Sequence, residues 1–144
     1  MADVHDCATR SYNMSQIKGK NTKPEILVRK FLFARGLRYK LHDNSLPGTP
    51  DLILPKFSTV IFINGCFWHG HQGCKYFSIP KTRKEWWENK IEYNQKKDTQ
   101  NHSALLGLGW RVITIWECDL KTHKREKTLL NLINKFKSNK WQIN

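Results

Sequence analysis

The spacing of apolar residues predicts an amphipathic helix over residues 22–36. Its apolar positions recur at helical spacing, at Leu27, Phe31 and Leu32. Thr22 is typical of a helix N-cap, Pro24 of a first turn, and Gly36 of the residue that ends a helix. Glu25 follows Thr22 by three residues, which is the spacing of a Thr-x-x-Glu capping box.

Four short apolar segments after this helix predict strands, at residues 38–41, 51–54, 59–63 and 110–116. The third is almost wholly apolar, as in a strand buried on both faces, and we expect the fourth to be buried too. Helical patterns cover residues 82–106 and 124–136. The order helix-strand-strand-strand-helix-strand-helix predicts a mixed central sheet flanked by helices, in the α/β or α+β class.

The charge of the chain favours a polyanionic partner. The 144 residues include 25 Lys and Arg against 12 Asp and Glu, which gives a net charge of +13. The positive charge is spread over three separated segments, residues 1–49, 75–97 and 119–144. This balance argues against a small-molecule enzyme without a polyanionic partner. It favours nucleic acid, with an acidic membrane surface as the weaker alternative.

The organisation of the chain predicts a single domain. No internal repeat or Ser/Gly linker divides it, so we expect one domain over 1–144, with a core at 22–137. Residues 1–21 are polar and basic, and we expect them to form an arm that contacts the nucleic acid. The longest apolar run, 60–63, is too short to span a bilayer, and the N-terminus lacks the apolar core of a signal peptide. We therefore expect an intracellular protein.

The segment from residue 64 to 74 carries a metal-ligand pattern. Cys66, His71 and Cys74 have the spacing C-x4-H-x2-C, and Cys118 follows the fourth predicted strand. Three Cys and one His form a common structural zinc set. Two alternatives remain open, namely free buried cysteines and a disulfide. His69 lies in the same segment, and spacing alone does not decide which of the two histidines would bind zinc.

Three polar residues are candidates for hydrolytic chemistry. Asp51 opens a strand beside another that ends at Asn64, so it could hold a hard divalent cation, although a turn or capping role is the simpler alternative. His69 could act as a general base near neutral pH. Glu25 could sit near Asp51, and this role does not exclude the capping box.

Four aromatic residues are candidates for insertion into nucleic acid. Phe67 and Trp68 lie in the Gly-rich loop, where a core role is less expected than on a strand. Trp86 and Trp87 open the long predicted helix, and adjacent helical positions point in different directions. Apolar side chains of this kind can wedge between base steps. For Trp86, Trp87 and Trp116 individually, core packing is the default expectation.

Several strings closely resemble the very short patch repair (Vsr) DNA mismatch endonucleases. They occur in the family's order between about residue 4 and residue 120: RSYNMSQI, TKPE, LPGTPD, VIFINGCFWHGH, WWENKIEYN and LGWRVITIWECDL. The resemblance implies a restriction-endonuclease-like core of the PD-(D/E)xK type. It also implies nicking of one strand at T:G mismatches, Mg²⁺ for hydrolysis and one structural Zn²⁺.

The resemblance also implies roles for individual residues. Asp51 matches the Mg²⁺-binding aspartate, Ile63 the residue whose backbone carbonyl binds Mg²⁺, His69 the catalytic histidine and Glu25 the glutamate beside the site. The zinc ligands would be Cys66, His71, Cys74 and Cys118. The residues that wedge beside the mismatch would be Phe67, Trp68 and a Trp at 86 or 87.

Three departures from the family pattern accompany these matches. Asn64 stands where some members carry a second active-site histidine, and the second pair of zinc ligands is one residue further apart. The (D/E)xK half of the parent signature is absent after the third strand, as the family leads one to expect.

The expected partner is double-stranded DNA with a T:G mismatch, bound by a monomer in the bacterial cytoplasm at the nucleoid. Proteins of mismatch repair or DNA methylation are further expected partners, and a membrane is not. Two alternatives stay open: a restriction or nicking endonuclease that acts on intact duplex, and a zinc-stabilised DNA-binding protein without catalysis.

Overall fold

A four-stranded mixed sheet forms the centre of the protein. The computed structural model describes residues 22–137, in which the strands lie in the order β1 (Lys40–Leu41), β2 (Leu52–Leu54), β3 (Thr59–Asn64) and β4 (Arg111–Trp116). β1 is antiparallel to β2, and β2 is antiparallel to β3. β3 and β4 run parallel, so that both end at the same edge of the sheet. The predicted mixed sheet is thereby confirmed.

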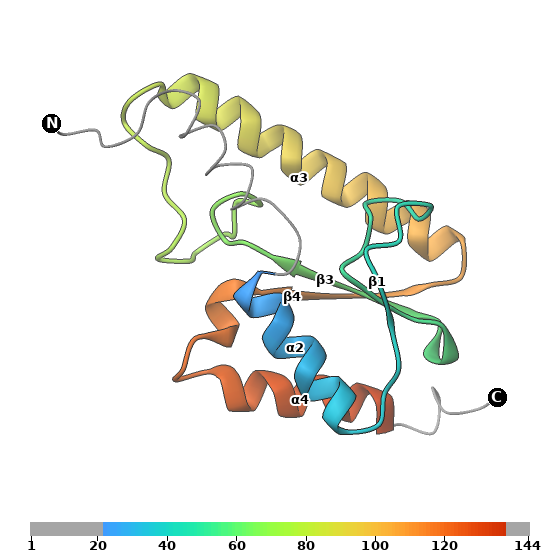
Figure 1. Cartoon of the computed structure of the whole chain (residues 1–144). Helices are drawn as coiled ribbons and strands as arrows, with labels where there is room; N and C mark the ends of the chain where they lie inside the picture. Colours follow the sequence, from blue (N-terminus) through green and yellow to red (C-terminus); the bar gives the residue numbers. More distant parts are fainter. Residues whose placement is uncertain (1–21, 138–144) are drawn as a thin grey trace, which may run out of the picture.

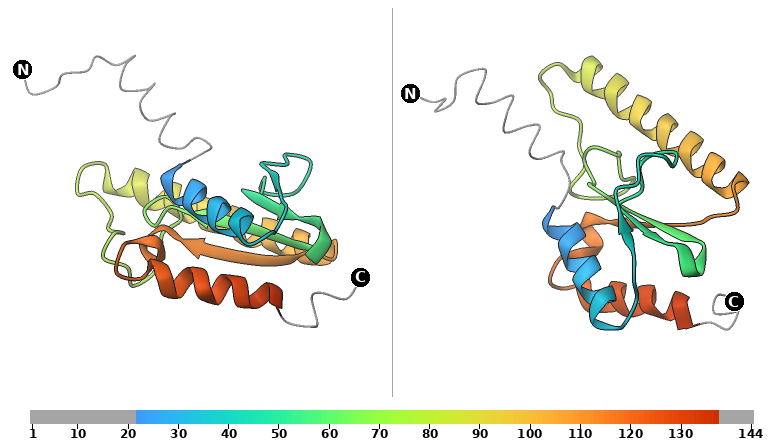
Figure 2. Two further views of the ribbon diagram at one scale, coloured as in Figure 1. Left: turned by 60° about the horizontal axis from the view of Figure 1, so that its bottom comes forward. Right: turned by 45° about the vertical axis from the view of Figure 1, so that its right-hand side comes forward.

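Helices cover both faces of this sheet (Figure 1). α2 (Lys23–Ala34) and α4 (Arg125–Lys137) lie on one face, and α3 (Lys84–Gly107) lies over the other. Short 3₁₀ helices at Pro55–Phe57 and Glu117–Leu120 follow β2 and β4. The views in Figure 2 show the same layers from two further sides. The order of helices and strands agrees with the prediction throughout the described residues.

The two faces of β3 belong to two separate apolar clusters. Ile61 packs in the larger cluster, which β3 shares with α2, α4 and β4. Val60 and Phe62 pack with Leu105 of α3 on the opposite face. Val60 and Ile61 are both fully buried. This confirms that residues 59–63 form a strand buried on both faces, and such a strand is a rigid base for the loop that follows it.

Two strand predictions need correction. The strand expected over residues 38–41 is only Lys40–Leu41, since only these two residues pair with β2, at Ile53 and Leu52. β4 is not buried along its whole length, since its residues alternate between buried, as at Ile113 and Ile115, and half-buried, as at Thr114. Within the described residues β4 pairs with β3 alone and forms an edge of the sheet, which leaves it less covered than β3.

Two expectations concern the surroundings of the core. The arm expected at residues 1–21 lies outside the described residues, so its contact with DNA stays a prediction. Among the residues that are described, no helix is long and apolar enough to cross a membrane.

Candidate active site

A cleft of about 490 Å³ lies between the start of α2, the start of β2, the end of β3 and the side of α3. Its lining includes all four residues that the sequence singled out for catalysis or for Mg²⁺: Glu25, Asp51, Ile63 and His69. Asn64, at the end of β3, lines the same cleft and is 5% exposed. The fold therefore brings together residues that are spread over more than forty positions of the chain.

Asp51 immediately precedes β2 and lies beside the end of β3. Its backbone N–H donates to the carbonyl of Ile61 (3.0 Å), and its Oδ2 accepts the N–H of Ile63 (2.7 Å). Burial, with a smaller contribution from the charge of Glu25, raises the pKa of the Asp51 carboxyl to about 6, although the hydrogen bond from the Ile63 N–H acts to lower it. A carboxylate that is costly to ionise without a positive partner is suited to a bound cation.

Glu25 lies at the first turn of α2 and also at the cleft, close to Asp51. Its backbone N–H donates to Oγ1 of the N-cap Thr22 (3.4 Å), as one half of a capping box requires. Its side chain, only 2% exposed, accepts a hydrogen bond from Nη1 of Arg29 at 3.0 Å. The N-cap therefore fixes the turn that holds this carboxylate at the cleft.

His42 lies beside the carboxylates of Glu25 and Asp51, and we call these three residues the carboxylate cluster. The sequence analysis missed His42. It follows β1 directly, and its Nε2 lies 2.8 Å from Oε2 of Glu25. One donor atom from each of Glu25, His42 and Asp51 lies within 4.8 Å of the other two. The available signal was the hairpin between β1 and β2, which places residue 42 beside residue 51.

His69 is paired with a carboxylate from α3. Its Nδ1 lies 2.6 Å from Oδ2 of Asp98, and both side chains line the cleft. A carboxylate at Nδ1 favours the tautomer with the proton on that nitrogen, which leaves Nε2 free to accept another. The sequence analysis missed Asp98, since nothing in the sequence shows which turn of α3 faces the loop.

The side of α3 also holds the backbone of residues 65–74, which we call the catalytic loop after the candidate catalytic residue His69 that it carries. Nδ2 of Asn94 donates to the carbonyl of Trp68 (2.7 Å), and Nε2 of Gln95 donates to the carbonyl of Gly70 (3.0 Å). Gly70 has a φ of +61°, and a Cβ there would lie only 2.6 Å from Cγ2 of Ile91. Glycine is therefore required for this close approach of loop and helix.

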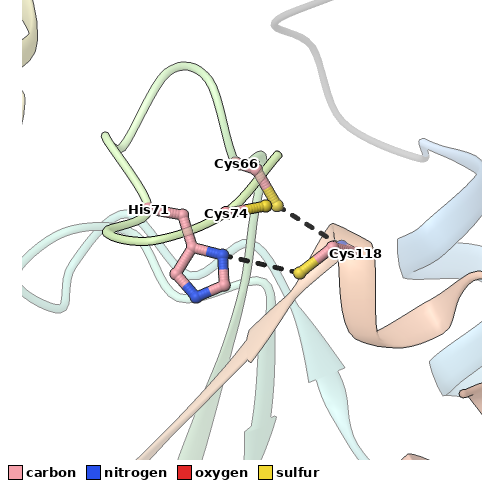
Figure 3. Close-up of side chains that lie close together, drawn as sticks. All are labelled: Cys66, His71, Cys74 and Cys118. Carbon is pink, nitrogen blue, oxygen red and sulfur yellow. Dashed lines mark hydrogen bonds between the residues drawn. The ribbon is translucent and has the colours of Figure 1, made fainter. Parts of the chain in front are cut away.

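The four predicted zinc ligands come together beside the cleft (Figure 3). Their donor atoms lie within 4.8 Å of one another: Cys66, His71, Cys74 and Cys118. The backbone N–H of Cys118 donates to Sγ of Cys66 (3.4 Å), and Sγ of Cys118 lies 3.5 Å from Nδ1 of His71. The imidazole in this cluster is that of His71, because His69 points to Asp98 instead.

The chemistry of this Cys/His cluster suits a soft or borderline metal ion. Three sulfur atoms and one imidazole nitrogen form a complete tetrahedral donor set. Burial raises the pKa of the Cys66 thiol to about 12 and also raises that of Cys118. Two buried thiols that resist ionisation become favourable thiolates when a cation replaces their protons. The ring of His71 also stacks on Trp116 at 4.0 Å, which fixes its orientation.

The four candidate wedge residues form one aromatic group over the loop and the start of α3. Phe67 lies 5.1 Å from Trp87, between ring centroids, and Trp68 lies 5.7 Å from it. These three rings are half-buried, whereas Trp86 is 46% exposed and Arg83 lies over its ring. Trp86 therefore faces outward and Trp87 packs inward, as expected of adjacent helical positions.

The chain is similar to proteins of one family. The family model described as DNA mismatch endonuclease Vsr matches residues 2–75. The chain is 45% identical to the DNA mismatch endonuclease Vsr of Escherichia coli (strain K12) over 125 residues. The aligned residues cover 87% of this chain and 80% of that protein.

Two further relatives carry the name Type II nicking enzyme. The chain is 47% identical to V.XorIIP of Xanthomonas oryzae pv. oryzae, over 83% of this chain and 88% of that protein. It is 46% identical to V.NmeAIP of Neisseria meningitidis, over 84% of this chain and 86% of that protein.

The raised pKa of Asp51 predicts that Asp51→Asn stabilises the protein in the absence of a divalent cation. Above the folded-state pKa of about 6 the folded protein holds a costly charge, and the amide removes it while still accepting the Ile63 N–H. The gain in unfolding free energy should be about 3 kcal/mol at pH 8, and it should shrink as the pH falls from about 6 towards the unfolded-state pKa of 3.8.

Urea unfolding of the two proteins at pH 8 and pH 5 measures this difference. Glu88→Gln, which removes an exposed carboxylate of α3, is the matched control and should change little. Equal stability of Asp51→Asn and wild type at both pH values would show that Asp51 is not destabilised by burial.

Proposed function

Since the chain belongs to the Vsr family of DNA mismatch endonucleases, we propose that it nicks one strand of duplex DNA at a T:G mismatch, with Mg²⁺ as the catalytic cation. The family resemblance read from the sequence motifs is confirmed, and the chain is a DNA endonuclease. The observation that supports the proposed reaction best is the single cleft lined by Asp51, Glu25 and His69.

The residues of the cleft fit a hard divalent cation. Asp51 supplies a carboxylate whose raised pKa reflects burial without a sufficient positive partner. The backbone carbonyl of Ile63, at the end of the neighbouring strand, is the second oxygen that the family resemblance implies. Oxygen donors of these two kinds are those that Mg²⁺ prefers. When bound there, Mg²⁺ supplies positive charge for the phosphate and lowers the pKa of water.

His69 is proposed to remove the proton from the attacking water. The 2.6 Å contact between Nδ1 and Asp98 supports this role, because it orients the ring and leaves Nε2 as the acceptor. Asp98 is thus a positioning residue, which also stabilises the imidazolium after proton transfer. Asn64 cannot serve as a second base, so we propose a mechanism with one histidine.

The core is proposed to be of the restriction-endonuclease-like PD-(D/E)xK class. Pro50 and Asp51 precede β2, and β3 beside it ends at the cleft, which agrees with the first half of that signature. No acidic residue and lysine follow in the second half, and His69 from the catalytic loop would supply the missing function. The family resemblance supports the class as well.

The Cys/His cluster is proposed to bind one structural Zn²⁺. Its three sulfurs and one nitrogen match a closed zinc set without a position for water. The ion would join the catalytic loop, through Cys66, His71 and Cys74, to the end of β4 at Cys118. Its role is then to hold the loop that carries His69, not to take part in hydrolysis.

Selection of the mismatch is proposed to depend on the aromatic group. A T:G wobble pair stacks less well than a normal pair, so insertion of rings beside it costs less. Phe67 and Trp68 line the cleft, and Trp86 is the exposed Trp of the pair at the start of α3. We therefore assign the third wedge position to Trp86 and a packing role to Trp87.

Nicking of a T:G duplex in the presence of Mg²⁺ is the test of the proposed reaction. We expect a single cut in one strand of the T:G duplex, no cut without added Mg²⁺, and far slower cutting of the matched duplex. His69→Gln should lower the rate by about 100-fold or more, the cost of losing a general base.

His102→Gln is the matched control, because this imidazole lines the same cleft but packs on Phe62. Equal cutting of both duplexes would favour the alternative enzyme that acts on intact DNA. Absence of cutting under all metal conditions would leave only the DNA-binding protein.

Removal of one proposed zinc ligand should release the metal. We expect one Zn²⁺ per chain in the purified protein, and Cys118→Ser should lose it together with thermal stability, because the catalytic loop is then no longer joined to β4. Elemental analysis and thermal unfolding measure both effects. Cys7→Ser is the control within the same chain, since Cys7 is not one of the four proposed ligands, and this variant should retain the metal. Full zinc content in Cys118→Ser would contradict the assignment.

Replacement of Phe67 and Trp68 by Ala should reduce selectivity more than stability. Neither ring belongs to the two core clusters of the described residues, so the loss in stability should stay below the ~3–5 kcal/mol typical of one buried aromatic. Affinity for the T:G duplex should fall more than affinity for the matched duplex, at fixed salt.

Phe62→Ala is the control for this measurement, because Phe62 belongs to the core. It should lower the melting temperature and leave the ratio of the two affinities unchanged. If the double variant behaves in the same way as Phe62→Ala, the two rings are core residues and do not select the mismatch.

A further inference from the structure

The backbone at His42 adopts a left-handed conformation that is uncommon for residues other than glycine. His42 has a φ of +50°, a region that few non-glycine residues occupy, although Asn, Asp and His occur there more often than other types. Its backbone N–H donates to the carbonyl of Asp51 (3.2 Å), which extends the ladder between β1 and β2 by one residue. Strain of this kind is most often retained where the side chain it orients has a function.

The imidazole of His42 points toward the two carboxylates of the carboxylate cluster, but its Nε2 makes no hydrogen bond within the described residues. This nitrogen is fully buried and lies 2.8 Å from Oε2 of Glu25. Glu25 already receives a hydrogen bond from Arg29 at the same oxygen. A simple ion pair between His42 and Glu25 would be expected to show hydrogen-bond geometry, and it does not.

We propose that His42 is a third side-chain ligand of the catalytic cation, and that its nitrogen makes the site prefer Mn²⁺ to Mg²⁺. This proposal deepens the proposed function, because it concerns the cation of the same cleft. Nε2 of His42 would bind the ion from behind the carboxylates, since His42 is not among the residues that line the cleft. Asp51 and Glu25 would supply the oxygen donors on either side.

The spacing of the three donors is compatible with one shared ion. All three lie within 4.8 Å of one another, and the closest pair, Glu25 and His42, is 2.8 Å apart. Adjacent ligands of an octahedral ion at about 2.1 Å are themselves separated by about 3 Å. Nε2 of His42 and Oε2 of Glu25 are therefore separated as two adjacent ligands of one ion would be.

The donor chemistry explains the preference among ions. Mg²⁺ is bound almost entirely through oxygen and retains several waters. Imidazole is a poor partner for it but a good one for first-row transition ions, of which Mn²⁺ also accepts carboxylates. A site with two carboxylates and one imidazole therefore retains Mg²⁺ activity and gains affinity for Mn²⁺.

The test is the binding of Mn²⁺ to the zinc-containing protein without DNA, followed by electron paramagnetic resonance. Pulsed measurements detect the ¹⁴N of an imidazole bound directly to Mn²⁺. His42→Asn is the variant of choice, because Asn tolerates the left-handed backbone and is too short to reach the ion. His42→Gln is the second variant, and zinc content verifies that each protein is folded.

We expect a ¹⁴N signal in the wild type that is absent from His42→Asn and retained in His69→Gln, the control for the other imidazole at the cleft. Mn²⁺ affinity should fall by about ten-fold or more in His42→Asn, and Mg²⁺ affinity should change much less. A wild-type signal lacking ¹⁴N would overturn the proposal. So would a signal that persists in both His42 variants.

The outcome is independent of the nicking assay. The proposed function fails if the wild type does not cut T:G duplex with Mg²⁺, whatever ligands the cation has. The assignment of His42 fails on the spectrum alone, even in an enzyme that cuts as proposed.

Discussion

The conformation of the catalytic loop is the constraint on which the active site depends. Residues 65–74 contain no regular helix or strand, yet they carry His69 and two of the proposed wedge residues. Two sets of contacts fix them. On one side the Cys/His cluster joins the loop to Cys118 at the end of β4, and on the other α3 binds the carbonyls of Trp68 and Gly70. Loss of either set would free the histidine from the cleft.

The sheet supplies the second half of the site, and it does so through register. β2 and β3 are antiparallel, so the start of one lies beside the end of the other, and Asp51 can accept the N–H of Ile63. Burial makes the Asp51 carboxylate costly to ionise, and among the described residues Arg29, His42 and His69 oppose the negative charge of the two carboxylates. A basic protein thus retains a local acidic pocket, which suits a cation placed between protein and phosphate.

Much of this arrangement could be predicted from the sequence, because it depends on local patterns. Helix capping at Thr22, the apolar run of β3 and the Cys/His spacing each define a feature without knowledge of the fold. Asp98 and His42 could not be found this way. Asp98 reaches His69 across 29 positions by the packing of α3, and His42 reaches Glu25 through a left-handed turn after a two-residue strand. Such contacts are decided by tertiary geometry alone.

The most direct test of this account is the coordination shell of the zinc that we propose to hold the loop. Zinc K-edge absorption fine structure of the purified protein should show three sulfurs at about 2.3 Å and one nitrogen at about 2.0–2.1 Å. That result would show that the metal links the catalytic loop to the end of β4. A shell with two sulfurs and two nitrogens, or a protein without zinc, would contradict it, because His69 would then be a ligand or the loop would have no metal to hold it.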